Sequence, residues 1–222
     1  VLAPMMTIVR THRPPASPDH RQLVVAVLFL MAATILILGG DGWISHAIVD
    51  WRPLGALLRW EEVGWLGNWM VQASILGMAA GVGWLARDLR LRAAAHCALF
   101  ALAFGGLVTI LLKHVSCRAR PFLPEAGAFH PPFCLQSGMD SFPSGHSAQA
   151  FAIAVILAGS YPRLSPLCYL AATMVGLSRV VVGVHYPSDV LVGAAIGLLS
   201  GVLCRQQLRR LAAAWQAHRE SS

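Results

Sequence analysis

The sequence predicts an all-α protein, a polytopic membrane bundle of six transmembrane helices. Of its 222 residues, 56% are apolar and only 12% are charged, and the mean hydropathy is +0.61. A soluble globular chain carries about 25% charged residues, so this chain has too few to cover a water-facing surface. The composition therefore excludes a disordered chain, a coiled coil and an ordinary cytosolic enzyme.

Six apolar runs approach the length of about 20 residues that a membrane-spanning helix needs. None of them alternates as a strand does, and lipid offers no partner for unpaired backbone groups, so each run is predicted to be helical. The predicted spans are Leu23–Leu38, roughly Gly64–Ala86, Ala93–Leu112, Ser147–Tyr161, Pro166–Val182 and Ser188–Leu203. The first run follows a basic head, as a secretory signal does. No small-residue cleavage pattern follows it, and Gly39–Gly42 reads as a turn, so we predict an uncleaved first span.

The charged residues lie in the gaps between these runs. The segments 1–21, 87–92 and 205–222 are net basic, whereas 39–68 is net acidic. Because Lys and Arg favour the cytoplasmic side, both termini are predicted to be cytoplasmic and the gaps at 39–68, 113–146 and 183–188 to lie outside. A net charge of +7 would suggest nucleic acid in a soluble protein, but here its placement reflects membrane topology, and no nucleic-acid partner is predicted.

The predicted organisation is one membrane domain between two tails. Residues 1–20 are expected to be a flexible cytoplasmic tail, 21–205 the six-helix domain and 206–222 a basic cytoplasmic tail. Five of the seven tryptophans lie between residues 43 and 69, and Trp concentrates at the membrane–water boundary. Residues 43–62 are therefore expected to lie on the outer surface as a short amphipathic helix, as an anchor or as a lip that guides a lipid substrate.

Ionisable residues at span ends in the outer gaps are costly in so apolar a chain and mark function. Lys113, Arg120 and Arg179 are three such cations without an acidic cluster, so no calcium- or magnesium-type metal site is expected. Three cations suit a phosphate, which Arg binds bidentately and Lys as a point charge. The fourth span opens with Ser144, a hydroxyl donor, and Gly145, where the backbone can approach a ligand; a helix start also attracts anions.

Two histidines accompany these cations. His185 and Asp189 are four residues apart, so the carboxylate can fix the tautomer of the imidazole and leave its other nitrogen free to attack. His146 would then protonate the departing oxygen as a general acid. The combination predicts phosphoryl transfer through a phosphohistidine.

The three polar segments resemble the signature of the type 2 phosphatidic acid phosphatase (PAP2) family. The first part of the signature is Lys, then six residues, then Arg-Pro, and it is matched by Lys113–Pro121. The second part is Pro-Ser-Gly-His, matched by Pro143–His146. The third part is Ser-Arg, then five residues, His, three residues and Asp, and it is matched by Ser178–Asp189. The resemblance implies a helical-bundle core with a metal-free site at the outer membrane face. It also implies a role for each matched position: His185 is the nucleophile, Asp189 orients it and His146 is the acid. The phosphate-binding residues that it implies are Lys113, Arg120, Ser144, Gly145 and Arg179.

The predicted function is metal-independent dephosphorylation of a lipid phosphate or pyrophosphate. Family members that this chain resembles use phosphatidic acid, phosphatidylglycerol phosphate, undecaprenyl pyrophosphate or lipid A. The alternatives are a lipid-to-lipid phosphotransferase and a non-catalytic lipid-phosphate binder or transporter; the apolar spans oppose a soluble haloperoxidase-like relative. The expected partners are the lipid substrate and the bilayer, with no cofactor and no obligatory protein partner. The short chain and few loops indicate a bacterial inner membrane, with the site facing the periplasm.

Four further residues of the outer gap have open interpretations. Cys117 and Cys134 share this gap and would pair in an oxidising space, but the sequence does not show the distance between them. Arg118 lies within the first motif at a position that the motif does not fix, and it is interpreted as a further phosphate contact. Asp140 either repels a wrongly placed anion or is simply solvated.

Overall fold

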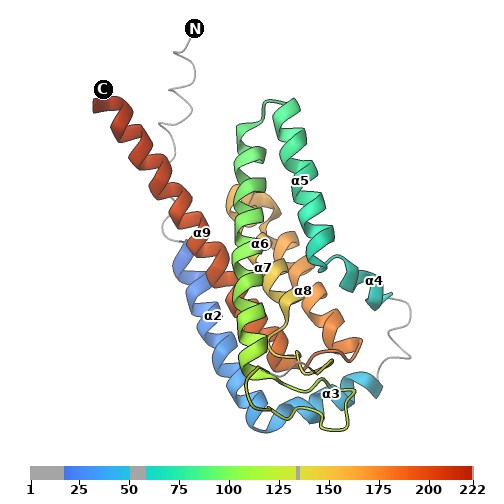
Figure 1. Ribbon diagram of the computed structural model, residues 1–222. Helices are drawn as coiled ribbons and strands as arrows, with labels where there is room; N and C mark the ends of the chain where they lie inside the picture. The colour runs from blue at the N-terminus through green and yellow to red at the C-terminus, as the bar shows by residue number, and fades with distance from the viewer. Residues whose placement is uncertain (1–17, 51–58, 134–135, 222) are drawn as a thin grey trace.

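The computed structural model describes residues 18–50, 59–133 and 136–221, and these residues form helices and loops without a named strand (Figure 1). The all-α prediction is confirmed. The helices are α2 (Pro18–Ile35), the π-helical η1 (Leu36–Gly40), α3 (Asp41–Asp50), α4 (Trp60–Trp65), α5 (Trp69–Leu85), α6 (Leu89–Ser116), α7 (Gly145–Ser160), the 3-10 helix η3 (Pro162–Leu164), α8 (Ser165–Val181) and α9 (Pro187–Ser221).

Each predicted span overlaps one of the long helices. Among the described residues, four stretches are long and apolar enough to cross a membrane: His20–Ile48, Leu89–Ser116, Pro162–Val181 and Pro187–Gln207. The helices α5 and α7 are apolar but shorter. The chain is therefore an integral membrane helical protein, and six crossings remain the prediction.

Two boundaries differ from the prediction. The turn predicted at Gly39–Gly42 is wrong, because η1 continues directly into α3 and Asp41 has helical backbone angles. The wider π-helical turn carries two glycines without ending the helix. The second predicted span also starts too early: Gly64 belongs to α4, and α5 begins at Trp69, where the side chain of Asn68 caps it by accepting from the N–H of Met70.

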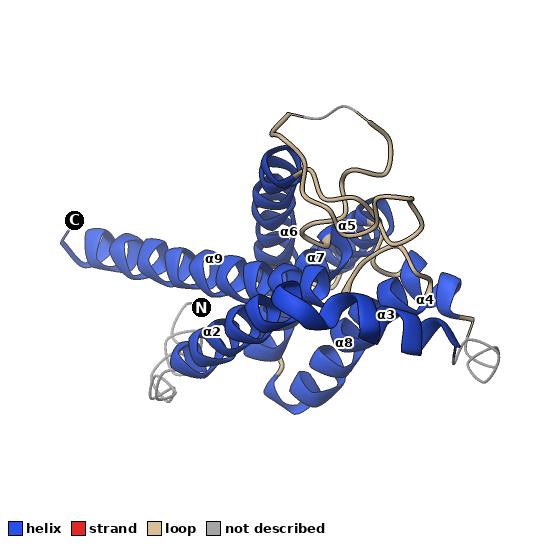
Figure 2. Cartoon of the chain, turned by 90° about the horizontal axis from the view of Figure 1, so that it is seen from below, coloured by secondary structure: helices blue, strands red, loops and turns tan. Residues whose placement is uncertain are grey.

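The segment predicted to lie on the outer surface forms two short helices, α3 and α4, and its residues 51–58 fall outside the described part of the chain. Both helices lie at the same end of the bundle as the long loop between α6 and α7 (Figures 1 and 2). The C-terminal part of α9 extends toward the opposite end (Figure 1). Two of the gaps that the charge pattern predicted to lie outside, 39–68 and 113–146, are therefore close together in space.

The core is built on the contact between α7 and α9, which is the most extensive in the bundle. A stripe of three glycines on α9 makes it close. A Cβ atom added to Gly193 would lie 2.3 Å from the carbonyl oxygen of Ser144. One added to Gly197 would lie 2.2 Å from the carbonyl oxygen of Ala148, and one added to Gly201 would lie 2.7 Å from Val155 Cβ. Small residues every fourth position allow membrane helices to approach closely. This contact fixes the start of α7 against the start of α9.

Candidate active site

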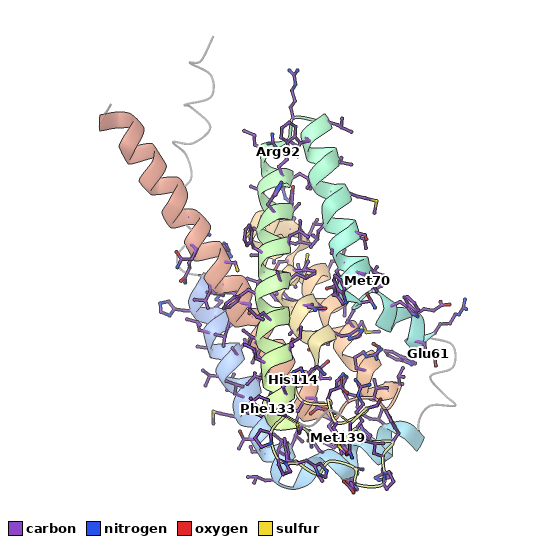
Figure 3. All side chains as sticks on the ribbon, viewed as in Figure 1. Glu61, Met70, Arg92, His114, Phe133 and Met139 are labelled. Atoms are coloured by element: carbon purple, nitrogen blue, oxygen red, sulfur yellow. The ribbon has the colours of Figure 1, made fainter. Side chains whose placement is uncertain are left out.

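Five segments bring the predicted site residues together at the loop end of the bundle. Lys113 ends α6, Arg120 lies in the following loop, His146 opens α7, Arg179 ends α8 and His185 precedes α9. His146 interacts electrostatically with the other four residues, and His185 does so with Lys113 and Arg120. Figure 3 shows His114 and Met139, the chain neighbours of Lys113 and Asp140, at this end. The convergence that the motifs predicted is therefore present.

His185 is buried, with 3% of its surface exposed. Its Nδ1 lies 3.5 Å from Asp189 Oδ2 and makes no hydrogen bond among the described residues. This distance is longer than an ordinary N–H···O bond, and catalytic hydrogen bonds are often long before substrate binds. Burial lowers the pKa of His185 although Asp189 opposes the shift, so the imidazole is neutral at neutral pH.

Asp189 is fully buried and held by three donors. Oδ2 accepts from the hydroxyl of Ser141 at 2.5 Å and from the backbone N–H of Tyr186 at 2.8 Å, and Oδ1 accepts from Arg118 Nη1 at 2.6 Å. A buried carboxylate is tolerated only when it is paired and hydrogen-bonded. Asp189 is thus fixed in place beside the imidazole.

Asp140 pairs with two of the three predicted phosphate-binding cations and offsets part of their charge. Lys113 Nζ donates to the backbone carbonyl of Asp140 and lies 3.6 Å from its Oδ2, while Arg120 Nη2 lies 2.9 Å from the same oxygen. Burial raises the pKa of Asp140, but the attraction of Lys113 and Arg120 outweighs it and leaves the pKa below its ordinary value. The side chain is 51% exposed yet paired, so the interpretation as a simply solvated residue is wrong.

Three arginines near the site each have a buried Nε atom without a hydrogen-bond acceptor among the described residues: Arg118, Arg120 and Arg179. Buried donors are normally satisfied, so each exception needs an explanation. Because both Nη atoms of Arg118 are bonded within the protein, an unused Nε by itself does not distinguish the predicted phosphate ligands from Arg118.

Helix α4 packs directly on the site, which the sequence did not reveal. A Cβ atom at Gly64 would lie 2.5 Å from Arg179 Nη1, and one at Gly67, just after α4, would lie 2.8 Å from His146 Cδ2. Two glycines therefore allow the backbone of this segment to approach a predicted phosphate ligand and the predicted acid. Glycines three residues apart among five tryptophans are the sequence signal for this close approach.

The start of α7 carries two of the predicted phosphate-binding residues, Ser144 and Gly145. Ser144 is the N-cap, and its hydroxyl accepts from the N–H of Ser147 at 3.4 Å, so this oxygen caps the helix. A Cβ atom at Gly145 would meet Thr109 Oγ1 at an ordinary 3.8 Å. Packing within the described residues therefore does not require glycine at this position, and phosphate binding by Ser144 and Gly145 stays a prediction.

Arg118 does not have the surroundings of a phosphate contact. Both Nη atoms are used by acidic side chains and a hydroxyl within the protein: Nη1 contacts Asp189 and Ser188, and Nη2 contacts Asp41. The sequence could not show this, because the partner carboxylate at Asp41 is 77 residues away and follows an apolar run that ends in two glycines.

Cys117 is disulfide-bonded. Cys134, the second member of the predicted pair, lies outside the described residues, so that pairing stays a prediction. Three cysteines in the helices are free: Cys97, Cys168 and Cys204. Among the residues that the structure describes, no group of three or more His, Cys, Asp and Glu side chains is placed to hold a metal ion.

An apolar helical bundle with three cations and two histidines gathered at one end defines a membrane protein with a cationic site. A family comparison is more specific: the PAP2 superfamily matches residues 94–212, more than half of the chain. The chain belongs to this superfamily, as its three motifs indicated.

Relatives agree with this assignment. The chain is 42% identical to a lipid A 1-phosphatase of Rhizobium johnstonii over 100 residues, which are 44% of this chain and 41% of that protein. The chain thus spans about two fifths of the length of such relatives. The fold resembles a PAP2-type phosphatidylglycerolphosphate phosphatase from Bacillus subtilis, with a TM-score of 0.64, 26% identity and coverage of 85% of this chain and 96% of the other. It also resembles Aquifex aeolicus LpxE, with a TM-score of 0.59, 26% identity and coverage of 75% and 94%.

Proposed function

We propose that this protein is a metal-independent membrane phosphatase that removes phosphate from a lipid phosphate or lipid pyrophosphate. One observation carries the proposal: Lys113, Arg120 and Arg179 gather around the two histidines, His146 and His185, and His185 is buried beside a fixed carboxylate. Membership of the PAP2 superfamily and the two phosphatase structures support it.

The proposed reaction has two steps. Burial and the surrounding cations lower the pKa of His146 to about 3. The negative charge of the bound phosphate opposes this shift, so His146 takes up its proton together with the substrate. The cations bind the phosphoryl oxygens, and His185 Nε2 attacks phosphorus as the bond to the lipid oxygen breaks, while the protonated His146 gives that oxygen its proton. Water then attacks the phosphohistidine, the P–N bond breaks, and His146 takes a proton from the water. Inorganic phosphate leaves, and the histidines return to their starting states.

The substrate is proposed to be a membrane lipid, because the site lies at the end of apolar helices. Among the candidates, the relatives named lipid A 1-phosphatase favour a lipid A type, and the Bacillus subtilis structure favours phosphatidylglycerol phosphate. The proposed location is a bacterial inner membrane with the site toward the periplasm and both termini in the cytoplasm. A lipid-to-lipid phosphotransferase would use the same intermediate, whereas a passive binder would not need the paired histidines.

A substrate screen tests the proposal. Purified protein in detergent, with EDTA present, is assayed for phosphate release from lipid A, phosphatidylglycerol phosphate, phosphatidic acid and undecaprenyl pyrophosphate. We expect turnover of at least one of them, undiminished by EDTA. Labelled phosphate transferred to an added acceptor lipid would instead support the phosphotransferase. Binding of these lipids without release or transfer of phosphate would contradict the proposal.

Asp140 provides a prediction about phosphate affinity. Because its carboxylate is paired with Lys113 and Arg120, phosphate has to compete with it. Asp140→Asn should tighten inhibition by inorganic phosphate by roughly fivefold, the value of a partly exposed ion pair of about 1 kcal/mol. The matched control is Glu125→Gln, which removes an exposed carboxylate paired with His130 instead and should leave the inhibition constant unchanged. Weaker inhibition in Asp140→Asn would mean that Asp140 chiefly holds the cations in position.

A further inference from the structure

A buried ionic network connects the beginning of α3 to the carboxylate beside the proposed nucleophile. Arg118, 3% exposed, is at its centre. Its Nη1 donates to Asp189 Oδ1 at 2.6 Å and to Ser188 Oγ at 2.7 Å, and its Nη2 donates to Asp41 Oδ2 at 2.8 Å. Asp41 in turn accepts from the backbone N–H of Ser188 at 3.0 Å and from the Ser188 hydroxyl. One guanidinium therefore bridges two buried carboxylates from different parts of the chain.

Two aromatic rings fix the plane of this guanidinium. Arg118 Cζ lies 4.2 Å from the centre of the Tyr186 ring and 5.0 Å from that of Phe129. The backbone N–H of Tyr186 also donates to Asp189, so the ring and the carboxylate are parts of one unit. A planar fork with donors on both arms can bind both acids at once and stack on a ring, which the single ammonium of lysine cannot do.

The charges of the network suit the proposed chemistry. Asp41 and Asp189 carry two negative charges against the single positive charge of Arg118, and all three groups are buried. When His185 accepts a phosphoryl group at Nε2 and keeps a proton on Nδ1, its ring becomes cationic, and Asp189 is the carboxylate that faces it at 3.5 Å. An Asp189 that rotated away, or that lost its charge, would not support this intermediate.

We infer that Arg118 and Asp41 are positioning residues that hold the carboxylate of Asp189 toward His185 during phosphoryl transfer, and that they do not bind the phosphate. This inference rests on the proposed function. It makes the start of α3 part of the catalytic assembly, although Asp41 is 148 residues from Asp189 in the sequence and lies outside all three motifs.

The test separates positioning from binding. In Arg118→Met, kcat on the preferred lipid phosphate should fall by about 100-fold, the effect of a small misplacement of a catalytic group. KM and the inhibition constant of inorganic phosphate should change by less than about twofold, because Lys113, Arg120 and Arg179 remain. Arg118→Lys should recover only part of kcat. Asp41→Asn, which keeps the size of the side chain nearly unchanged, should lower kcat by roughly tenfold. Arg163→Met, at an exposed arginine in η3, is the matched control.

Non-additivity gives a second readout. If Arg118 acts through Asp189, the double variant Arg118→Met with Asp189→Asn should be no slower than the slower of the two single variants. Full multiplication of the two effects would overturn the inference, as would a normal kcat in Arg118→Met. A rise in the phosphate inhibition constant of tenfold or more would make Arg118 a phosphate ligand and overturn it too.

Two other results, an Arg118 variant that does not fold and a protein without phosphatase activity, also have a defined meaning. If Arg118→Met does not fold, the near-isosteric Asp41→Asn decides, and a normal kcat in that variant overturns the inference. Failure of the proposed function looks different: the unmodified protein would then release no phosphate from any lipid of the panel.

Discussion

His185→Ala should abolish phosphate release, with kcat lowered by at least about 10³-fold, since removal of a nucleophile eliminates the covalent route itself. The other parts of the site stay in place in this variant. Lys113, Arg120 and Arg179 come from other segments, so binding of inorganic phosphate should persist. The measurement is phosphate release from the preferred lipid, combined with isothermal titration of inorganic phosphate.

A second histidine serves as the matched control. His96 is exposed on α6 near the end remote from the site, and its Nδ1 contacts the carbonyl of Arg92 in the same helix. His96→Ala should therefore turn over lipid at the unmodified rate. Residual turnover in His185→Ala above a few per cent would remove His185 from the role of nucleophile while leaving the phosphatase activity itself intact.

The sequence located the helices that are strongly apolar and bounded by charges. The helices α6, α7 and α8 begin and end within a few residues of the predicted spans because hydropathy depends only on local composition. Helix α9 begins where predicted but continues beyond Leu203 to Ser221, because its polar C-terminal part remains helical although it is not apolar. Residues 39–42 and 64–68 were misassigned for a different reason. The glycines at 39–42 indicated a turn, whereas the π-helical η1 carries Gly39 and Gly40 directly into α3. The glycines at 64 and 67 were assigned to a span, whereas they allow α4 and the residues after it to pack closely on Arg179 and His146, which are distant in the sequence.

The same distinction applies to the site. The motif positions are predicted to share one ligand, so their chemistry could be predicted from residue type and spacing alone. The surroundings of Arg118 and Asp140 could not be predicted in this way, because they depend on partners from other segments. Arg118 contacts Asp41 and Asp189, and Asp140 contacts Lys113 and Arg120. Charge balance within a buried site is a tertiary property, and it appears only when the segments are placed together.

The α7–α9 contact gives the second large effect, this time on stability. A side chain at Gly197 has no room, because even a Cβ atom would lie 2.2 Å from the backbone carbonyl of Ala148 and 2.9 Å from the backbone nitrogen of Ala152. Backbone atoms cannot rotate aside as a flexible side chain can, so Gly197→Leu has to push the two helices apart. We expect the free energy of unfolding to fall by about 3 kcal/mol or more, the upper range for overpacked cores.

The loss of stability should be accompanied by a loss of activity, because the same contact fixes the site. The backbone N–H of Ser144, which precedes α7, donates to the carbonyl of Asp189 in the first turn of α9 at 2.9 Å, so separated helices would move His146 away from His185. Thermal unfolding in detergent and phosphate release test both expectations. Gly77→Leu is the matched control, since a Cβ atom at Gly77 on α5 meets nothing within 4 Å. Equal unfolding temperatures for the two leucine variants would show that α7 and α9 tolerate a wider separation than their contacts indicate.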